Sequence, residues 1–292
     1  MKNKKVVVRL TGGLGNQLHQ YAYGLVLANK IQAEILFDKE FLVNYSKKLN
    51  ITFRDIEINK FDIKVKFYKS ILSNHFVLRL IKKLKFISSF LEAFKIKVIT
   101  QYQQIDDLIL NDTDFIYLDG IIGNYQDYKN DVDLIKSSLN VSPSFADMVE
   151  IVKGEIDTED SVSIHVRRSD YLKEGSIHHI LDMSYYQKAI EYFESTTENP
   201  VFYIFSDDRQ FVEESFKGKN VRMIEYLGKN PDFFDFLAIK TCKHHIIANS
   251  TFSWWAAFLE SVENRKTIAP SIFLKTEELD LKLTYPENWI IF

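Results

Sequence analysis

Two adjacent arginines form the clearest chemical signal in the sequence. They stand in the run His-Val-Arg-Arg-Ser-Asp at residues 165–170, directly after an apolar stretch typical of a strand. A guanidinium group binds two phosphate oxygens at once, and ligands of open α/β sheets bind at the carboxyl ends of strands. The run therefore indicates an anion site. The alternative is one structural Arg–Asp pair beside one surface arginine.

A second candidate phosphate site is the run Gly-Gly-Leu-Gly-Asn-Gln at residues 12–17, between an expected strand and an expected helix. Gly13 and Gly15 let backbone N–H groups approach a phosphate, and a helix N-terminus favours negative charge. A nicotinamide-dinucleotide turn is one alternative, with Asp38 at the ribose. However, Leu18 stands where that fingerprint requires its third glycine. A plain turn without a ligand is the other alternative.

Small hydroxyl residues precede a third expected helix, in the run Asn-Ser-Thr-Phe-Ser-Trp-Trp at residues 249–255. Ser250 or Thr251 could cap that helix, or their hydroxyl and N–H groups could bind a phosphate. We expect Trp254 and Trp255 in the helix core rather than on a sugar-binding surface.

Carboxylates occur at two further places. Asp207 follows an apolar strand and could accept hydrogen bonds from a guanine edge, or it could take part in an ordinary helix cap. The run Asp-Thr-Asp at residues 112–114 spells a metal-binding Asp-x-Asp, but we expect it in a loop before a strand. We therefore predict no metal site.

The elements that position these residues alternate between strand and helix in both halves. Alternation of this kind favours parallel sheets. We predict an α/β protein with two Rossmann-like domains facing a cleft, residues 1–150 and 151–292. The expected strands are 5–10, 34–38, 115–118, 161–166, 201–206, 244–248 and 267–269, and the expected helices include 17–31, 184–195, 232–242 and 252–260.

Composition restricts the setting and the partners. A length of 292 residues suits two domains, and a net charge of −3 gives no reason to expect a nucleic-acid partner. Cys242 is the only cysteine, so a disulfide framework is impossible and a reducing compartment is expected. No signal peptide and no apolar run of about 18 residues is present, so we predict a cytoplasmic protein.

Residues 64–98 are rich in Lys and Arg, and Glu92 is their only acid. The part at 76–84 has the pattern of a helix that is both apolar and basic. It is either a solvated surface helix with its apolar side packed inward, or a helix resting on anionic lipid at the inner face of the plasma membrane.

The glycine run, the arginine motif and the Ser-Thr-Phe-Ser-Trp-Trp run, in this order along the chain, resemble the bacterial α1,2-fucosyltransferases of glycosyltransferase family 11. The resemblance runs from Gly12 to about Phe258, and the run Tyr-Pro-Glu-Asn-Trp at 285–289 also fits. It implies the GT-B arrangement, GDP-β-L-fucose as donor, inversion at the sugar, and no cofactor or metal. It also implies transfer to the 2-hydroxyl of a galactoside acceptor, as in surface polysaccharide synthesis, with the donor bound by the C-terminal domain and the acceptor on the side of the N-terminal domain.

The resemblance also assigns a donor site. It implies that Arg167 contacts the β-phosphate, that His165 and Asp207 lie near the guanosine, and that Asn16 approaches the diphosphate. The full set of predicted donor-binding residues is Gly13, Gly15, Asn16, His165, Arg167, Asp207, Ser250, Thr251 and Phe252.

Transfer also requires leaving-group stabilisation and a base. Arg167 can offset the charge that develops on GDP. Asp170 and Glu174 are the candidate bases, although Asp170 could instead only orient Arg168. A binding module for nucleotide sugars or phosphoglycans would keep the arginines and need no base, so turnover of GDP-fucose separates the two alternatives.

Two residues depart from the family pattern. His19 stands where the family usually has phenylalanine, and Gly123 stands where a glutamine is expected. Both departures concern acceptor preference rather than donor binding.

Overall fold

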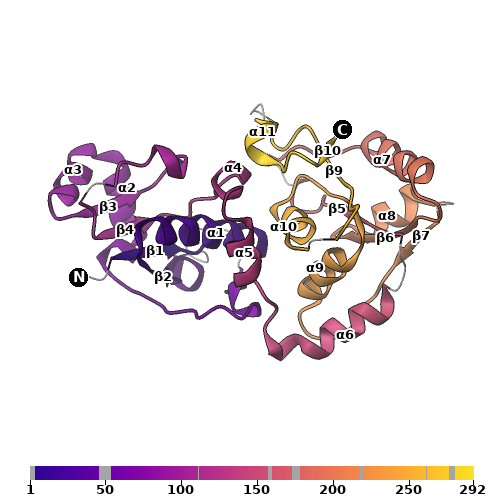
Figure 1. Ribbon diagram of the computed structural model, residues 1–292, viewed down its shortest axis with the longest axis horizontal. Coiled ribbons are helices and arrows are strands. Elements are labelled where there is room, and N and C mark those ends of the chain that lie inside the picture. The colour runs from indigo at the N-terminus through magenta and orange to yellow at the C-terminus, as the bar shows by residue number, and fades with distance from the viewer. Residues whose placement is uncertain are drawn as a thin grey trace. The chain divides into compact units, whose positions relative to one another are not determined.

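The computed structural model describes residues 4–45, 54–110, 112–156, 160–172, 178–217, 220–260, 262–275 and 280–292. Contacts divide the chain into two compact units, Met1–Pro143 and Ser144–Phe292. Each unit is built on a parallel sheet with helices (Figure 1), so the predicted α/β class with parallel sheets is confirmed.

The N-terminal unit has a four-stranded sheet in the order β2-β1-β4-β3. Its central strand β1 has three consecutive buried valines, as expected of a parallel strand covered on both faces. The strands are β1 (Lys5–Arg9), β2 (Glu34–Asp38), β3 (Ile96–Ile99) and β4 (Phe115–Leu118), and the helices are α1 (Leu14–Ile31), α2 (His75–Lys83), α3 (Lys85–Ala93), α4 (Tyr125–Tyr128) and α5 (Val132–Ser138).

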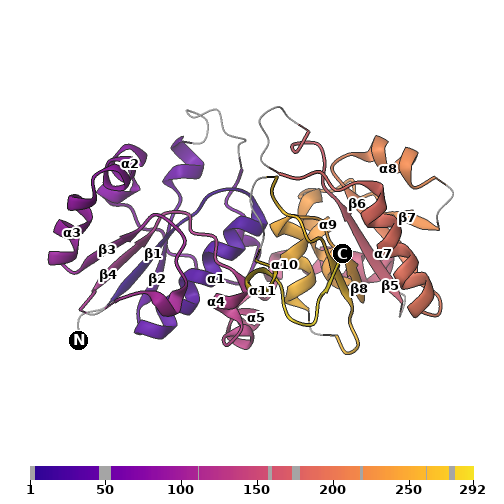
Figure 2. The ribbon, with the colours of Figure 1, turned by 90° about the horizontal axis from the view of Figure 1, so that it is seen from above.

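Helices α2 and α3 lie beside β3 and β4 in both ribbon views (Figures 1 and 2). Leu78 and Ile81 of α2 pack in one apolar cluster with Val7 of β1 and Tyr117 of β4. The basic segment at 64–98 is therefore anchored on the sheet by the inward side of its helices.

The C-terminal unit has a six-stranded parallel sheet in the order β10-β9-β8-β5-β6-β7. The chain runs from β5 outward to β7 and then returns to the other side of β5 for β8. The strand order therefore reverses between β5 and β8, which is where open α/β sheets bind ligands. The strands are β5 (Ser161–Val166), β6 (Val201–Ser206), β7 (Val221–Met223), β8 (His244–Ile246), β9 (Thr267–Ala269) and β10 (Ile290–Ile291).

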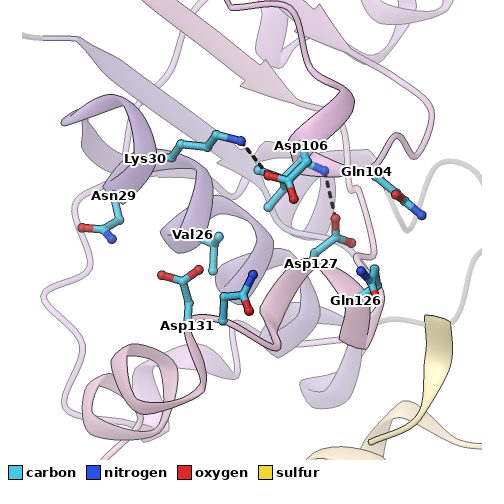
Figure 3. A pocket seen from close by; sticks show the side chains of 10 residues that line it. Val26, Asn29, Lys30, Gln104, Asp106, Gln126, Asp127 and Asp131 are labelled. Atoms are coloured by element: carbon cyan, nitrogen blue, oxygen red, sulfur yellow. Dashed lines mark hydrogen bonds and ion pairs between the residues drawn. The ribbon is translucent and has the colours of Figure 1, made fainter. Parts of the chain in front are cut away.

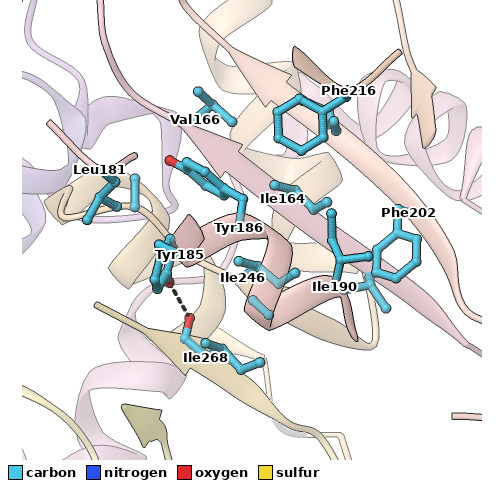
Figure 4. Packing of buried hydrophobic residues seen from close by; sticks show 14 of the residues in the cluster. Ile164, Val166, Leu181, Tyr185, Tyr186, Ile190, Phe202, Phe216, Ile246 and Ile268 are labelled. Atoms are coloured by element: carbon cyan, nitrogen blue, oxygen red, sulfur yellow. Dashed lines mark hydrogen bonds between the residues drawn. The ribbon is translucent and has the colours of Figure 1, made fainter. Parts of the chain in front are cut away.

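The two faces of this sheet take different helices, because successive side chains of a strand alternate between faces. Ile164 of β5 packs with Tyr186 and Ile190 of α7 (Figure 4). Its neighbour His165 instead lies against Phe252 of α10. The helices are α6 (Ala146–Glu155), α7 (Met183–Thr196), α8 (Arg209–Ser215), α9 (Pro231–Thr241), α10 (Thr251–Leu259) and α11 (Leu281–Thr284).

Candidate functional site

Two of the predicted motifs flank the point where the strand order of the C-terminal unit reverses. The arginine motif directly follows β5, and the segment 249–252 leads from β8 into α10. Because β5 and β8 are parallel neighbours, their carboxyl ends lie at the same edge of the sheet. The fold therefore brings together residues that are about 80 positions apart in the sequence.

Arg167 is held by two carboxylates. Its Nη2 lies 2.6 Å from Asp170 Oδ2, and its Nη1 lies 3.1 Å from Asp207 Oδ2. Burial alone would lower the pKa of Arg167, but the hydrogen bond to Asp170 and the charge of Asp207 raise it, so the guanidinium stays charged. The suggestion that Asp170 orients Arg168 is wrong, because Asp170 binds Arg167.

Arg168 has separate partners. Its guanidinium lies 3.7 Å from the ring centre of Phe211, and its Nε lies 3.4 Å from Asp208 Oδ2. Its backbone N–H donates to Asp207 Oδ1 at 2.9 Å. Both arginines are thus ion-paired at the sheet edge, and the side chains of Arg167 and Arg168 are 25% and 19% exposed.

His165 is buried behind the arginines, with 6% of its surface exposed. Burial, with a smaller effect from the charge of Arg167, lowers its pKa to about 3, so the imidazole is neutral at physiological pH. Its Nδ1 has no hydrogen-bond partner in the described part of the chain. Its ring centre lies 5.6 Å from that of Phe252.

The start of α10 is capped locally. Ser250 Oγ accepts a hydrogen bond from the N–H of Phe252, and Thr251 is the first helical residue. The capping interpretation of Ser250 is therefore confirmed. Trp254 and Trp255 are buried, as predicted for core residues.

Two residues beside this helix start were not identified from the sequence. Tyr171 donates its hydroxyl hydrogen to the carbonyl of Asn249 at 2.9 Å and stacks on His178 at 4.2 Å between ring centres. Tyr171 directly follows the arginine motif, which was a usable signal, whereas no sequence pattern points to His178. The candidate base Glu174 lies outside the described residues.

The glycine run of the N-terminal unit forms a tight turn into α1. Gly12 has φ +70°, and a Cβ placed on it would lie 2.5 Å from Nδ2 of Asn16. Gly13 is the N-cap of α1 and has no side chain to cap the helix. Gly15 lies buried in the first turn, and Asn16 follows it. The helix therefore begins with backbone N–H groups that no N-cap side chain covers.

Gln17 connects this turn to the segment that contains Asp55 and Glu57. Its amide donates to the carbonyls of Gly12 at 2.9 Å and Asp55 at 2.7 Å, and it accepts from the N–H of Glu57 at 2.8 Å. Arg54 is also brought to the turn, because a Cβ placed on Gly13 would lie 3.8 Å from its Cδ and Nε. Nothing in the sequence around Arg54 singles it out.

Asp38 does not provide a ribose-binding carboxylate. It is fully buried and accepts hydrogen bonds from the Tyr117 hydroxyl and from the N–H of Glu40. With these partners and no exposure it is a structural residue, which removes the dinucleotide alternative for this unit.

The Asp-x-Asp sequence precedes β4 and so lies at the opposite end of the sheet from the glycine turn. Asp112 forms an ion pair with Lys95. No group of three or more His, Cys, Asp or Glu side chains suited to a metal ion occurs in the described ranges.

A polar pocket of about 230 Å³ opens in the N-terminal unit beside the last turns of α1 (Figure 3). Val26 and Asn29 line one side of it, and Asp127 lies opposite. Asp127 accepts hydrogen bonds from Tyr102 and from two backbone N–H groups. The pocket contains none of the predicted site residues, and ten or more helical residues, about 15–20 Å, separate it from the glycine turn.

No helix within the described residues combines the length and the apolar character needed to cross a bilayer.

Comparison with known proteins gives a consistent pattern. The chain matches the family model of glycosyl transferase family 11 over residues 1–292. An α-1,2-colitosyltransferase of Escherichia coli is 29% identical over 294 residues, covering 98% of both chains. The O-antigen biosynthesis glycosyltransferase WbnK of the same species is 28% identical, over 89% of this chain and 92% of the relative.

More distant similarities agree. A galactoside α-(1,2)-fucosyltransferase 1 of Bos taurus is 29% identical over 132 residues, which are 43% of this chain and 36% of that protein. The crystal structure of the fucosyltransferase NodZ from Bradyrhizobium has a TM-score of 0.57 at 12% identity, over 89% of this chain and 94% of that chain. At this level of identity the structural similarity concerns the fold.

Proposed function

Because the chain belongs to glycosyltransferase family 11, we propose that it transfers L-fucose from GDP-β-L-fucose to the 2-hydroxyl of a terminal β-galactoside. The transfer inverts the sugar and forms an α1,2-fucoside. We assign donor binding to residues 151–292 and the acceptor side to residues 1–150. The observation that carries the proposal is Arg167, a charged and partly exposed guanidinium at the strand-order reversal of the C-terminal sheet.

Arg167 and the four charged side chains around it suggest how the donor is recognised. Two guanidinium groups face three carboxylates, of Asp170, Asp207 and Asp208, which leaves little free positive charge for a diphosphate. We propose that Asp207 turns to the guanine edge when GDP binds and accepts its N–H donors. Nη1 of Arg167 then becomes available to the β-phosphate.

The same groups would also stabilise GDP as it leaves. Arg167 offsets the charge that grows on GDP, and the hydroxyl and N–H groups of Ser250 and Thr251 assist at the start of α10. His165 supplies a neutral, buried imidazole whose free Nδ1 suits a nucleoside hydrogen bond. The backbone N–H groups after Gly13, with Asn16, give the N-terminal unit its contribution to diphosphate binding.

Asp170 is better suited to position Arg167 than to remove a proton. Its Oδ2 is committed to the guanidinium at 2.6 Å, and a neighbouring cation makes a carboxylate a weaker base. We therefore propose Asp170 as a positioning residue and keep Glu174 as the candidate base.

The experiment that tests the function is turnover of GDP-fucose with a panel of β-galactosides, with linkage analysis of the product. An α1,2-linked fucoside supports the proposal. Binding of GDP-fucose without turnover on any sugar acceptor would instead favour a nucleotide-sugar-binding module.

Colitose is a second candidate for the transferred sugar, because a relative that covers 98% of this chain is named an α-1,2-colitosyltransferase. Colitose is L-fucose without its 3-hydroxyl group. A site that hydrogen-bonds a hydroxyl rejects the analogue lacking it by about 10⁴-fold, whereas an apolar site discriminates weakly. Competition between GDP-fucose and GDP-colitose for one acceptor therefore decides the donor.

We also propose a role in the synthesis of a bacterial surface polysaccharide, at the cytoplasmic face of the plasma membrane. The similarity to an O-antigen biosynthesis glycosyltransferase supports the pathway class. The basic segment at 64–98 supports peripheral contact with anionic lipid.

A further inference from the structure

Helix α3 has apolar side chains on two adjoining sides. Ile87 and Leu91 pack inward on the sheet cluster. Phe86, Phe90 and Phe94 follow one another at intervals of four, so they share the adjoining side, where they are 69%, 62% and 64% exposed. The rings of Phe90 and Phe94 lie 5.1 Å apart.

Helix α2 contacts α3 and also has both buried and exposed apolar side chains. Leu78 and Ile81 are buried, whereas Phe76 and Leu80, again four residues apart, are 64% and 49% exposed. We call Phe76, Leu80, Phe86, Phe90 and Phe94 the phenylalanine face. Five large, exposed apolar side chains on two contacting helices mark an interaction surface more often than an ordinary solvated one. The apolar residues of this segment are therefore divided between the sheet cluster and this exposed face.

Positive charge accompanies the phenylalanine face. Residues 64–98 contain nine Lys or Arg and one acid, in a chain whose net charge is −3. Four of these cations are already paired with acids outside the segment: Lys66 with Glu34, Lys69 with Glu40, Lys82 with Asp119, and Lys95 with Asp112. Arg79 and Lys83 of α2 are exposed, and neither forms an ion pair with another described residue.

The charge decides between possible occupants. A second copy of the chain packed symmetrically on this face would bring two positively charged segments together. An anionic bilayer complements both features, because its interface accepts aromatic side chains and its headgroups attract cations. We propose that the phenylalanine face inserts into the headgroup region of an anionic membrane, with Arg79 and Lys83 at the lipid phosphates.

Membrane contact through the phenylalanine face extends the peripheral location proposed above, on which it rests. Insertion of aromatic side chains then becomes the main interaction with the lipid, in place of the attraction between charges. Four of the cations are neutralised within the protein, so the attraction between charges is weaker than the number of lysines suggests. The phenylalanines therefore contribute a larger share of the binding. Lys82 is a poor target for testing the electrostatic part, since its partner Asp119 also holds the buried Arg9. Vesicle binding needs neither donor nor acceptor, so its outcome is independent of the proposed transfer reaction.

The test is co-flotation of the full chain with vesicles of phosphatidylglycerol and phosphatidylcholine, against phosphatidylcholine alone. We expect binding to the anionic vesicles. The triple variant Phe86→Gln, Phe90→Gln, Phe94→Gln should lower the partition coefficient about tenfold or more, at low and high salt alike. The double variant Arg79→Gln, Lys83→Gln should lower it about tenfold at low salt, and less at high salt because charges are screened.

A matched control replaces three exposed apolar residues outside the face, Ile151, Leu227 and Val262, by Gln and should bind like the wild type. All variants should keep the wild-type unfolding midpoint, because the replaced side chains are exposed. Undiminished binding by the phenylalanine variant overturns the proposal. So does a wild-type dimer in lipid-free solution that the same variant dissociates, since the occupant is then a second copy.

Discussion

At the scale of single residues, the effect of the charge of Arg167 can be separated from the effect of its planar, two-pronged shape. Arg167→Lys keeps a cation but loses the fork that holds Asp170 and Asp207. We expect activity to fall roughly 100-fold or more, because an ammonium cannot bind two oxygens in the same plane. Initial rates with GDP-fucose, together with GDP affinity from calorimetry, measure the loss.

The control for this substitution is Arg209→Lys, an exposed arginine of α8 that pairs with Glu213. It should leave both rate and affinity unchanged. Near-normal turnover by Arg167→Lys would remove Arg167 from the mechanism.

Metal independence is a second prediction at this scale. Arg167 is proposed to take the role that a divalent ion has in other transferases, and Asp112 of the Asp-x-Asp sequence is paired with Lys95 at the far end of its sheet. We expect the rate to be unchanged in excess EDTA. Loss of activity with the chelator and recovery with Mg²⁺ or Mn²⁺ would contradict this and make Asp112 and Asp114 ligands.

At the scale of elements, the two departures from the family pattern belong to one cluster between α1 and α4. His19 Nδ1 lies 3.1 Å from the Tyr128 hydroxyl, and a Cβ on Gly123 would lie 2.5 Å from that hydroxyl and 2.7 Å from the ring of Tyr23. Gly123 also forms backbone hydrogen bonds with His19 and Tyr128. A glutamine at 123 cannot be accommodated while Tyr128 keeps this position. The departures are therefore linked by packing.

We expect Gly123→Ala to lower the free energy of unfolding by about 1–3 kcal/mol, because it overfills this cluster. Gly154→Ala in α6 is the control, since a Cβ there meets nothing within 4 Å and should be neutral or stabilising. Urea unfolding of both variants measures the difference. Equal stability of the two variants would show that the cluster tolerates a side chain at 123.

At the scale of the whole molecule, buried histidines should make stability depend on pH. Burial lowers the pKa of His19 and His165 to about 3 and of His244 to about 4, and that of His245 falls well below its ordinary value. Between pH 6.5 and these values the unfolded chain binds more protons than the folded one. The free energy of unfolding therefore falls as the pH decreases, by about 2 kcal/mol at pH 5 for each fully buried histidine.

Asp235 acts in the opposite direction. Burial, helped by the charge of Asp232, raises its pKa to about 7, so its contribution increases stability as the pH falls from 7 toward 3.8. Because the buried histidines outnumber this one carboxyl group, we expect a net loss of stability as the pH decreases. Urea unfolding at about pH 7.5 and about pH 5 measures the change, and equal stability at both values would contradict the burial of neutral histidines.

Residue types and their order along the chain were enough to predict the class of the fold, the family and the position of the motifs along the strands. Apolar runs and the turns that end them are local features, so β5, β6 and the start of α10 could be located from residue types alone. Three motifs in a fixed order were enough to identify family 11, because each motif is a short run of residue types that needs no knowledge of its spatial neighbours.

Which side chains meet, by contrast, depends on how the strands are ordered in the folded protein. Strand order brings Asp207 to Arg167 and Tyr117 to Asp38, and no local pattern encodes a pairing over such separations. The sequence also could not show that Phe86 and Phe90 are exposed. Helical periodicity shows that α3 has a broad apolar face, but it cannot tell which part of that face the sheet covers.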